Sequence, residues 1–214
     1  MAMIDTPWEQ IDYSSVCDQY NKRITTHHLL KTFLDKPDIP NYVQLALGIE
    51  DHSGNYSAAK HGLGPIILAH STHEQVFALA KKLSMCQSPN SIPDIIYQHD
   101  LPHLKISVGS EMAMMLRPNL HWVTNTRTLW AYFVLHSQGS TDRANEILRL
   151  SKDRPEESPM NYDYWKEWHP LVGSSLIKLG ELGTQAAYKQ GKEPGDKKYL
   201  WADAIADQLY AKFS

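Results

Sequence analysis

The chain has 214 residues, of which 42% are hydrophobic and 21% charged, and it carries a net charge of −3. The apolar fraction is that of an ordinary globular protein, which excludes an intrinsically disordered chain. The slightly acidic balance and the scattered Lys and Arg residues argue against a basic surface for nucleic acid or anionic lipid, so we expect neither a nucleic-acid nor a membrane partner.

Capping patterns divide the first part of the chain into short helices. Thr6 and Glu9 form a capping box with Pro7 at the first helical position, which predicts that a helix begins there. Thr25 or Thr26 is expected to cap a second helix. The helices predicted in this part cover residues 7–21, 26–36 and 40–48, and they precede a loop over residues 50–64.

Two interpretations are open for residues 65–83. Either Pro65 begins one long helix, or a short buried segment precedes a new helix whose capping box is formed by Ser71 and Glu74. Helix is favoured in both halves, because the apolar residues at positions 66–68 are too few to establish a strand.

The centre of the chain carries the strongest structural signal. Residues 129–135 are all apolar or aromatic, so the helix predicted over about residues 124–138 is apolar on every side and must be surrounded by other helices. Residues 103–108 are the one candidate strand, because apolar and polar residues alternate there, but a single strand has no partner. We expect an all-α, compact multi-helix bundle around this buried central helix, with at most one short strand.

A stripe of small residues marks the helix expected to follow position 170. Gly173, Gly180 and Ala187 recur every seven residues. Each glycine inside a helix costs about 0.5–1 kcal/mol relative to alanine, so the stripe indicates a neighbour that packs closely against it. This neighbour is either another helix of the same chain, such as the last one, or a second copy of the chain in a homodimer, and self-association is therefore one expectation.

The last helix is predicted to begin after Asp196 and to be amphipathic. Its buried face is formed by residues that recur every fourth position, namely Trp201, Ile205, Leu209 and Phe213. Asp203 and Asp207 are expected on the face toward water. A polar break at residues 151–159 could divide two lobes, but we expect a single domain over residues 1–214.

The cysteines and the first residues bear on location. Cys17 and Cys86 are expected to be reduced and partly buried, because a chain of this size folds without a disulfide. The first residues lack the charged and apolar regions of a signal peptide. Both observations favour a cytoplasmic protein.

Histidines and carboxylates supply one set of candidate site residues. A pair of histidines three positions apart, a His-Asp pair and a distant aspartate in an all-helical chain resemble the HD superfamily of metal-dependent phosphohydrolases. The resemblance implies a divalent metal that activates water and polarises a phosphate ester. Its ligands would be His70 or His73, His99, Asp100, and Asp142 or Asp163. The other interpretation is that these histidines are surface or capping residues.

A second candidate site lies where two helices are expected to begin, one just before Glu111 and one near Asn125. Free N–H groups at helix N-termini bind anions, and an Arg127 guanidinium can grip an anion with two donors. Glu111, Asn125 and Arg127 are therefore candidate residues for an anion or a small polar ligand. In the structural alternative, Thr124 or Asn125 only caps the helix and Arg127 pairs with Glu111.

No nucleotide-binding loop, nucleophile elbow or zinc-protease motif occurs in the sequence. We expect a binding or regulatory module that acts through an interaction surface and whose small-molecule ligand is unknown. The alternative is the metal-dependent phosphohydrolase, for which a divalent metal is the cofactor.

Overall fold

The computed structural model describes residues 6–152 and 161–214, and these residues form helices and loops with no strand among them. The all-α prediction is confirmed. The α-helices are α1 (Pro7–Gln10), α2 (Tyr13–Asp35), α3 (Ile39–Ala46), α4 (Tyr56–Lys60), α5 (Leu63–His70), α6 (His73–Met85), α7 (Ile92–His99), α8 (Ile106–Leu116), α9 (Thr126–His136), α10 (Thr141–Lys152), α11 (Tyr162–Lys189) and α12 (Lys198–Phe213). Two short 3-10 helices are η1 (His52–Gly54) and η2 (Pro89–Ser91).

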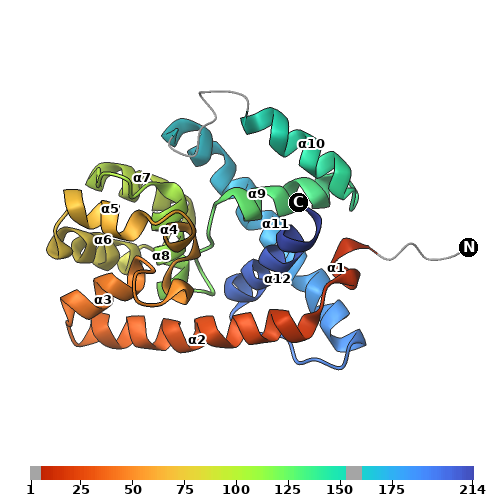
Figure 1. Cartoon of the computed structure of the whole chain (residues 1–214), viewed down its shortest axis with the longest axis horizontal. Helices are drawn as coiled ribbons and strands as arrows, with labels where there is room; N and C mark the ends of the chain where they lie inside the picture. The colour runs from red at the N-terminus through yellow and green to blue at the C-terminus, as the bar shows by residue number, and fades with distance from the viewer. Residues whose placement is uncertain (1–5, 153–160) are drawn as a thin grey trace, which may run out of the picture.

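Figure 1 shows α2 running along the long axis of the molecule. Helices α3 to α8 lie over one half of α2, which we call the first half, and α1 with α9 to α12 lie over the other, the second half. Accordingly, α2 packs against α3 and α8 in the first half and against α12 in the second. One helix thus supports both halves, and the buried apolar side chains form one continuous cluster.

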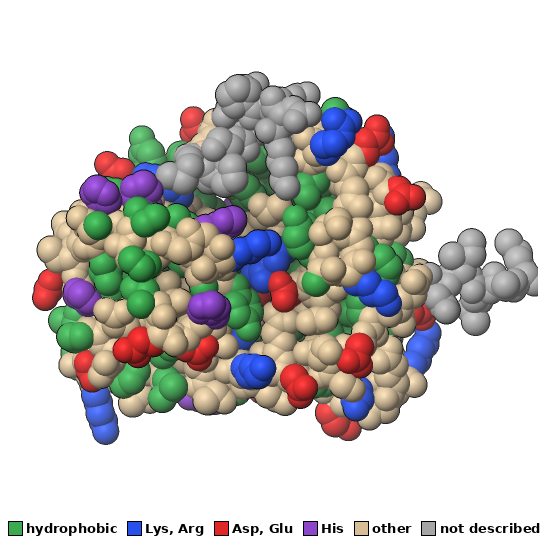
Figure 2. Space-filling view, viewed as in Figure 1, with side chains coloured by type: hydrophobic (Ala, Val, Ile, Leu, Met, Phe, Trp, Pro, Cys, Tyr) green, Lys and Arg blue, Asp and Glu red, His purple; other side chains and the backbone are tan. Residues whose placement is uncertain are grey.

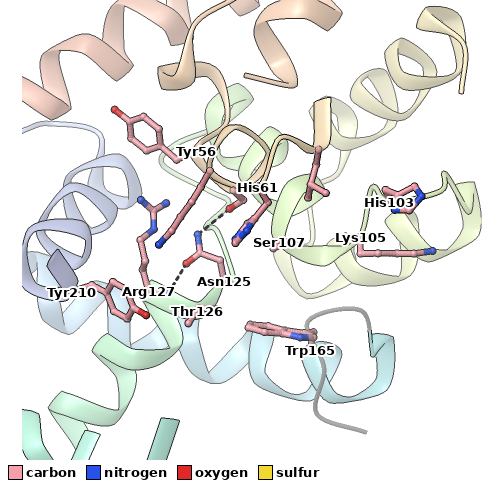
Figure 3. Close-up of a pocket in the computed structure, with 13 residues that line it drawn as sticks. Tyr56, His61, His103, Lys105, Ser107, Asn125, Thr126, Arg127, Trp165 and Tyr210 are labelled. Carbon is pink, nitrogen blue, oxygen red and sulfur yellow. Dashed lines mark hydrogen bonds between the residues drawn. The ribbon is translucent and has the colours of Figure 1, made fainter. Parts of the chain in front are cut away.

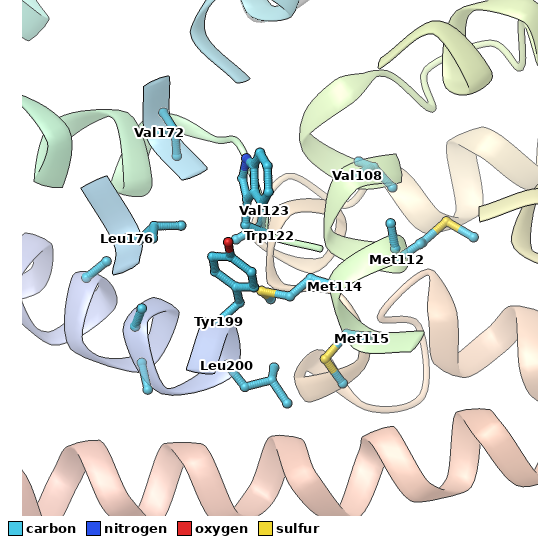
Figure 4. Close-up of a cluster of buried hydrophobic side chains, with 14 of the residues drawn as sticks. Val108, Met112, Met114, Met115, Trp122, Val123, Val172, Leu176, Tyr199 and Leu200 are labelled. Carbon is cyan, nitrogen blue, oxygen red and sulfur yellow. The ribbon is translucent and has the colours of Figure 1, made fainter. Parts of the chain in front are cut away.

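The core between the two halves is centred on Trp122, in the segment that joins α8 to α9. Figure 4 shows its indole between methionine side chains of α8 and the apolar residues Val172 and Leu176 of α11. The Trp122 ring also lies 5.3 Å from the Tyr199 ring of α12, and its indole N–H donates to the His169 carbonyl oxygen at 2.8 Å. This joining segment is therefore fixed between the halves by packing and hydrogen bonding.

Helix α9 is shorter than the central helix expected from the sequence, and it is not buried on every side. Trp130 is fully buried, but Tyr132 is only half-buried and His136 is exposed. Helices α10, α11 and α12 pack against α9 and leave part of its surface uncovered. The Tyr132 ring instead stacks on His136, with ring centroids 4.1 Å apart. An aromatic residue at a partly covered position was mistaken for a core residue.

The first predicted helix is interrupted after α1. The side chain of Asp12 accepts a hydrogen bond from the Ser14 backbone at 2.9 Å and caps α2, which begins there. Thr25 and Thr26 lie inside α2, where each hydroxyl donates to a carbonyl oxygen one turn earlier instead of capping a new helix. Threonine fits both positions, and tertiary packing of the long helix decided between them.

Residues 103–108 contain the beginning of a helix instead of a strand. Leu104 follows a turn at residues 102–103, while Ile106 and Val108 belong to the first turn of α8. All three side chains are buried. The alternation of apolar and polar residues thus reflects burial around the start of a helix.

Residues 65–83 fall into two helices, as favoured from the sequence, but with a different cap. Thr72 and Gln75 form the capping box of α6: the Thr72 backbone N–H donates to Gln75 Oε1 at 2.8 Å. Ser71 and Glu74, one residue earlier, do not form it. The pattern located the break between α5 and α6 to within one residue.

The stripe of small residues on α11 packs against other parts of the same chain. A methyl group at Gly173 would come within 2.3 Å of the Trp122 ring, and one at Gly183, a glycine beside the stripe, would come within 2.2 Å of Ile205. At Gly180 the nearest side chain is Ala202 of α12, at 3.7 Å. The close neighbour is therefore the last helix together with Trp122, and the stripe gives no support to self-association, which stays a prediction.

Other expectations can be compared with the described residues. Cys17 and Cys86 are free thiols and half-buried, as expected. Across residues 6–152 and 161–214, none of the helices combines the length and the apolar character needed to cross a bilayer. The polar break expected at residues 151–159 falls mostly outside the described residues.

Candidate functional site

A buried ionic cluster joins the two halves beneath the candidate site. Arg23 of α2 pairs with Glu111 of α8 at 2.7 Å and with Asp203 of α12, and all three side chains are inaccessible to solvent. The four-residue periodicity of α12 predicted that Asp203 faces water. This prediction is wrong, because Asp203 is fully buried. A carboxylate can occupy the buried face of α12 because Arg23 neutralises it.

Glu111 holds the start of α4 in place. Its carboxylate accepts hydrogen bonds from the backbone N–H groups of Tyr56 and Ser57, at 3.0 and 2.9 Å, and from the Ser57 hydroxyl at 2.6 Å. Burial alone would raise the pKa of Glu111, but Arg23, Arg127 and the Ser57 donors together lower it below its usual value. Glu111 is thus a buried anion that fixes α4 relative to α8.

Asp203 is in a different electrostatic position although it shares Arg23. Burial raises the pKa of Asp203 to about 6, against the attraction of Arg23 and Arg127. Its second oxygen, Oδ1, has no hydrogen-bond partner within the described parts of the chain. Asp203 therefore has fewer donors than Glu111, and its charge is less well compensated.

Arg127, in the first turn of α9, lies above this cluster. One guanidinium nitrogen, Nη1, pairs with Asp207 of α12, and the side chains of Arg127 and Asp207 are 12% and 27% exposed. The Tyr56 ring lies between two cations, 4.8 Å from Arg23 and 5.5 Å from Arg127. The second nitrogen of Arg127, Nη2, is buried and has no hydrogen-bond partner among the described residues.

Above Arg127 lies a cavity of about 490 Å³ between the two halves. Helix α4 and the start of α8 contribute from the first half, and α9, α11 and α12 from the second. Figure 3 shows Arg127 and Tyr56 at one end of the cavity and His103 and Lys105 at the other. Its lining residues are Tyr56, Ser57, Lys60, His61, Leu63, His103, Lys105, Ser107, Asn125, Thr126, Arg127, Trp165 and Tyr210.

The cavity lining is cationic and aromatic. It contains Lys60, Lys105 and Arg127 but, among the residues that the structure describes, no aspartate or glutamate. Figure 2 shows Lys and Arg side chains gathered at the middle of this face, with histidines nearby and an acidic side chain next to them. The walls include the rings of Trp165 and Tyr210. Such a lining favours a ligand that has an anionic group and an apolar or aromatic part.

Two helix N-termini meet at this cavity, as the sequence suggested, although one of the helices begins earlier than expected. Helix α8 starts at Ile106, so that Lys105 and Ser107 line the cavity. No side chain caps α8, whereas Asn125 caps α9 by accepting hydrogen bonds from Arg127 and Thr128 backbone N–H groups. The positive ends of both helix dipoles therefore add to the charge of the lining residues.

The three residues named as ligand candidates have different places. Asn125 and Arg127 line the cavity, whereas Glu111 is buried beneath it. Arg127 does not pair with Glu111, which was the alternative from the sequence. Glu111 instead pairs with Arg23, and Arg127 pairs with Asp207. Glu111 serves the site indirectly by holding Ser57, whose hydroxyl accepts a hydrogen bond from Asn125 at 3.1 Å.

Sequence reasoning missed most of the cavity wall. Tyr56, Lys60, Lys105, Trp165 and Tyr210 come from three helices and from the segment before α8. None of them belongs to a recognisable motif. Only the fold brings them together. The helix cap formed by Asn125 was the one sequence pattern that indicated where the cavity lies.

The candidate metal ligands are dispersed. The His99 ring nitrogen Nδ1 lies 2.9 Å from the Ile95 carbonyl oxygen, and Asp100 pairs with Lys105 at 3.5 Å. His70, at the end of α5, contacts the His103 ring, while His73 begins α6. In the described ranges no three His, Cys, Asp or Glu side chains are grouped so that they could hold a metal ion, with Asp142 and Asp163 included in that search.

Comparisons of the chain with protein-family models, with curated proteins and with solved structures gave no match. The function must therefore be inferred from the cavity itself.

Proposed function

We propose that the chain is a binding protein for a small anionic organic molecule, which it holds in the cavity between its two halves. The observation that carries this proposal is the composition of the lining: three cationic side chains, two histidines and three aromatic rings, with no carboxylate among the described residues that form it. A volume of about 490 Å³ lies within the range of cavities that enclose metabolite-sized ligands.

The position of the cavity supports a regulatory use of binding. A ligand there contacts α4 of the first half together with α9 and α12 of the second half. Such a ligand adds contacts across the junction that otherwise depends on Arg23 and its carboxylate partners. Ligand binding therefore stabilises one arrangement of the two halves, as expected for a binding or regulatory module.

The other expectations from the sequence differ in the support they have. A cytoplasmic location is consistent with the free thiols of Cys17 and Cys86. Neither self-association nor the metal-dependent phosphohydrolase alternative gains support from the described residues, since the glycine stripe is occupied and the candidate metal ligands are dispersed.

Thermal unfolding in the presence of small anions tests the proposal. A ligand that binds only the folded chain raises Tm, and the increase grows with the logarithm of the ligand concentration relative to Kd. A panel of carboxylates and phosphate esters should contain compounds that raise the Tm of the wild-type chain. Lys60→Gln, which removes one cavity cation, should abolish or greatly reduce this increase.

Lys82→Gln is the matched control, because Lys82 is an exposed lysine of α6 outside the cavity lining. It should respond to the same compounds as the wild type. The proposal is wrong if no anion raises Tm, or if Lys60→Gln responds as strongly as Lys82→Gln.

A further inference from the structure

We infer that the ligand of this cavity is a phosphomonoester that carries a planar ring, with the phosphate at the Arg127 end and the ring toward Trp165. This inference rests on the proposed function and makes it more specific. It depends on the number and direction of the free hydrogen-bond donors at one end of the cavity and on the aromatic walls beyond them.

The Arg127 end offers several donors that are not fully used within the described part of the chain. The Thr126 and Ser107 hydroxyls line the cavity and form no hydrogen bond to a described residue. Nη2 of Arg127 is not one of these donors, because it is inaccessible to solvent. The Asn125 side-chain amide donates one hydrogen bond, to Ser57, and has a second N–H to offer. In Figure 3, Ser107 and Asn125 lie close together beside Arg127.

The number of these donors favours a tetrahedral anion. A carboxylate has two oxygens in one plane, whereas a phosphate group has three terminal oxygens that accept hydrogen bonds from several directions. Donors on α8 and α9 approach the cavity from different elements of the fold, so that a planar group would leave part of them unpaired. Donors that a bound ligand encloses and leaves unpaired are costly.

The cation that lines this end and has no carboxylate partner among the described residues favours an anionic ligand group. Arg127 is largely neutralised by Asp207, but the Lys60 ammonium contacts only the face of the Tyr210 ring, 5.6 Å from its centroid, in the described structure. The helix N-termini of α8 and α9 add further positive potential. An anion is therefore expected beside Lys60 and the two helix N-termini, and the number of donors, not the net charge, favours a phosphate over a carboxylate.

The rest of the cavity lining indicates where the ring of the ligand lies. Trp165 and Leu63 line the cavity together with Tyr210, whose ring lies 5.6 Å from the Lys60 ammonium. Rings of this kind pack against a planar ring with face or edge contacts, and the apolar surface they bury favours binding without fixing the identity of the ring. Lys105 and His103 close the opposite end, where polar substituents of the ring can be solvated or bound.

Isothermal titration calorimetry in a phosphate-free buffer tests the inference with four probes: adenosine 5′-monophosphate, adenosine, ribose 5-phosphate and benzoate. Adenosine 5′-monophosphate should bind more tightly than either of its parts by at least about tenfold, because each part lacks one half of the contacts. Lys60→Gln should weaken binding of adenosine 5′-monophosphate by about tenfold, and Lys82→Gln should leave it unchanged.

The outcomes separate this inference from the proposed function. Binding of benzoate without tighter binding of adenosine 5′-monophosphate overturns the inference and leaves an anion-binding protein. Equal affinity for adenosine and adenosine 5′-monophosphate, or equal affinity of Lys60→Gln and the wild type for the nucleotide, overturns it as well. Failure of every probe to bind overturns this inference, while the proposed function still depends on the wider panel of anions.

Discussion

The guanidinium of Arg23 and the carboxylate of Glu111 lie 2.7 Å apart, and neither side chain is exposed to solvent. This ion pair connects α2 with α8, and the contact of Arg23 with Asp203 extends it to α12. Glu111 in turn fixes the backbone of Tyr56 and Ser57 at the edge of the cavity. The buried cluster is thus the support on which the candidate site is built.

Replacing Arg23 should destabilise the fold strongly. Arg23→Met leaves Glu111 and Asp203 buried without their cation, and loss of one partner of a buried ion pair costs about 3–5 kcal/mol. Urea unfolding followed by circular dichroism measures the loss. The exposed pair of Arg143 and Glu146 provides the control, since Arg143→Ala should change stability by less than about 0.5 kcal/mol. A loss below about 1 kcal/mol for Arg23→Met would show that the cluster is not a support of the fold.

Two glycines of α11 should respond oppositely to the same substitution. At Gly180 a methyl group meets nothing closer than 3.7 Å, so Gly180→Ala should stabilise the chain by about 0.5–1 kcal/mol through helix propensity. At Gly173 it would meet the Trp122 ring at 2.3 Å, so Gly173→Ala should destabilise by about 1–3 kcal/mol. Urea titrations of both variants decide the matter, and equal effects would mean that α11 does not pack on Trp122 as described.

Stability should fall as the pH decreases below about 6.5, because two histidines are buried in the neutral form. Burial lowers the pKa of His121 to about 4 and that of His169 to about 3 from a usual value of 6.5. Between about pH 4 and 6.5 the unfolded chain therefore binds more protons at these residues than the folded chain, and acid favours unfolding. Asp203 has the opposite sign: its raised pKa of about 6 makes the folded chain bind the extra proton, which favours folding as the pH falls toward 3.8.

A single substitution isolates one of these contributions. His169 accepts a hydrogen bond at Nδ1 from Thr124 and donates from Nε2 to the Pro89 carbonyl oxygen, and a glutamine can replace the donor without titrating. His169→Gln should reduce the slope of unfolding free energy against pH by about 1.4 kcal/mol per pH unit between pH 4 and 6.5. An unchanged slope would mean that His169 titrates normally in the folded chain.

Local patterns identified the helices well where the signal lies within one turn. The capping box of Thr6 and Glu9 is formed, with the Thr6 backbone N–H donating to Glu9 at 3.2 Å. The cap of α6 was misplaced by one residue, because Ser71 and Thr72 are equally suitable capping residues. The interruption before α2 was missed, because Asp12 also fits inside a helix when only the sequence is considered.

Contacts between distant positions account for the errors in burial and in the site. Asp203 lies on the buried face of α12 because Arg23, which is 180 positions away, neutralises it. No pattern of α12 alone contains this information. The cavity was found only in part for the same reason: Asn125 and Arg127 belong to a helix start, but Lys60 and Trp165 reach it through the packing of separate helices.

The most direct test of the cavity as an anion site is a crystal structure of the chain grown with adenosine 5′-monophosphate. We expect the phosphate oxygens within about 3 Å of the Lys60 ammonium and the Thr126 hydroxyl, with the ring against Trp165. A nucleotide bound elsewhere while this cavity contains only solvent would contradict the account.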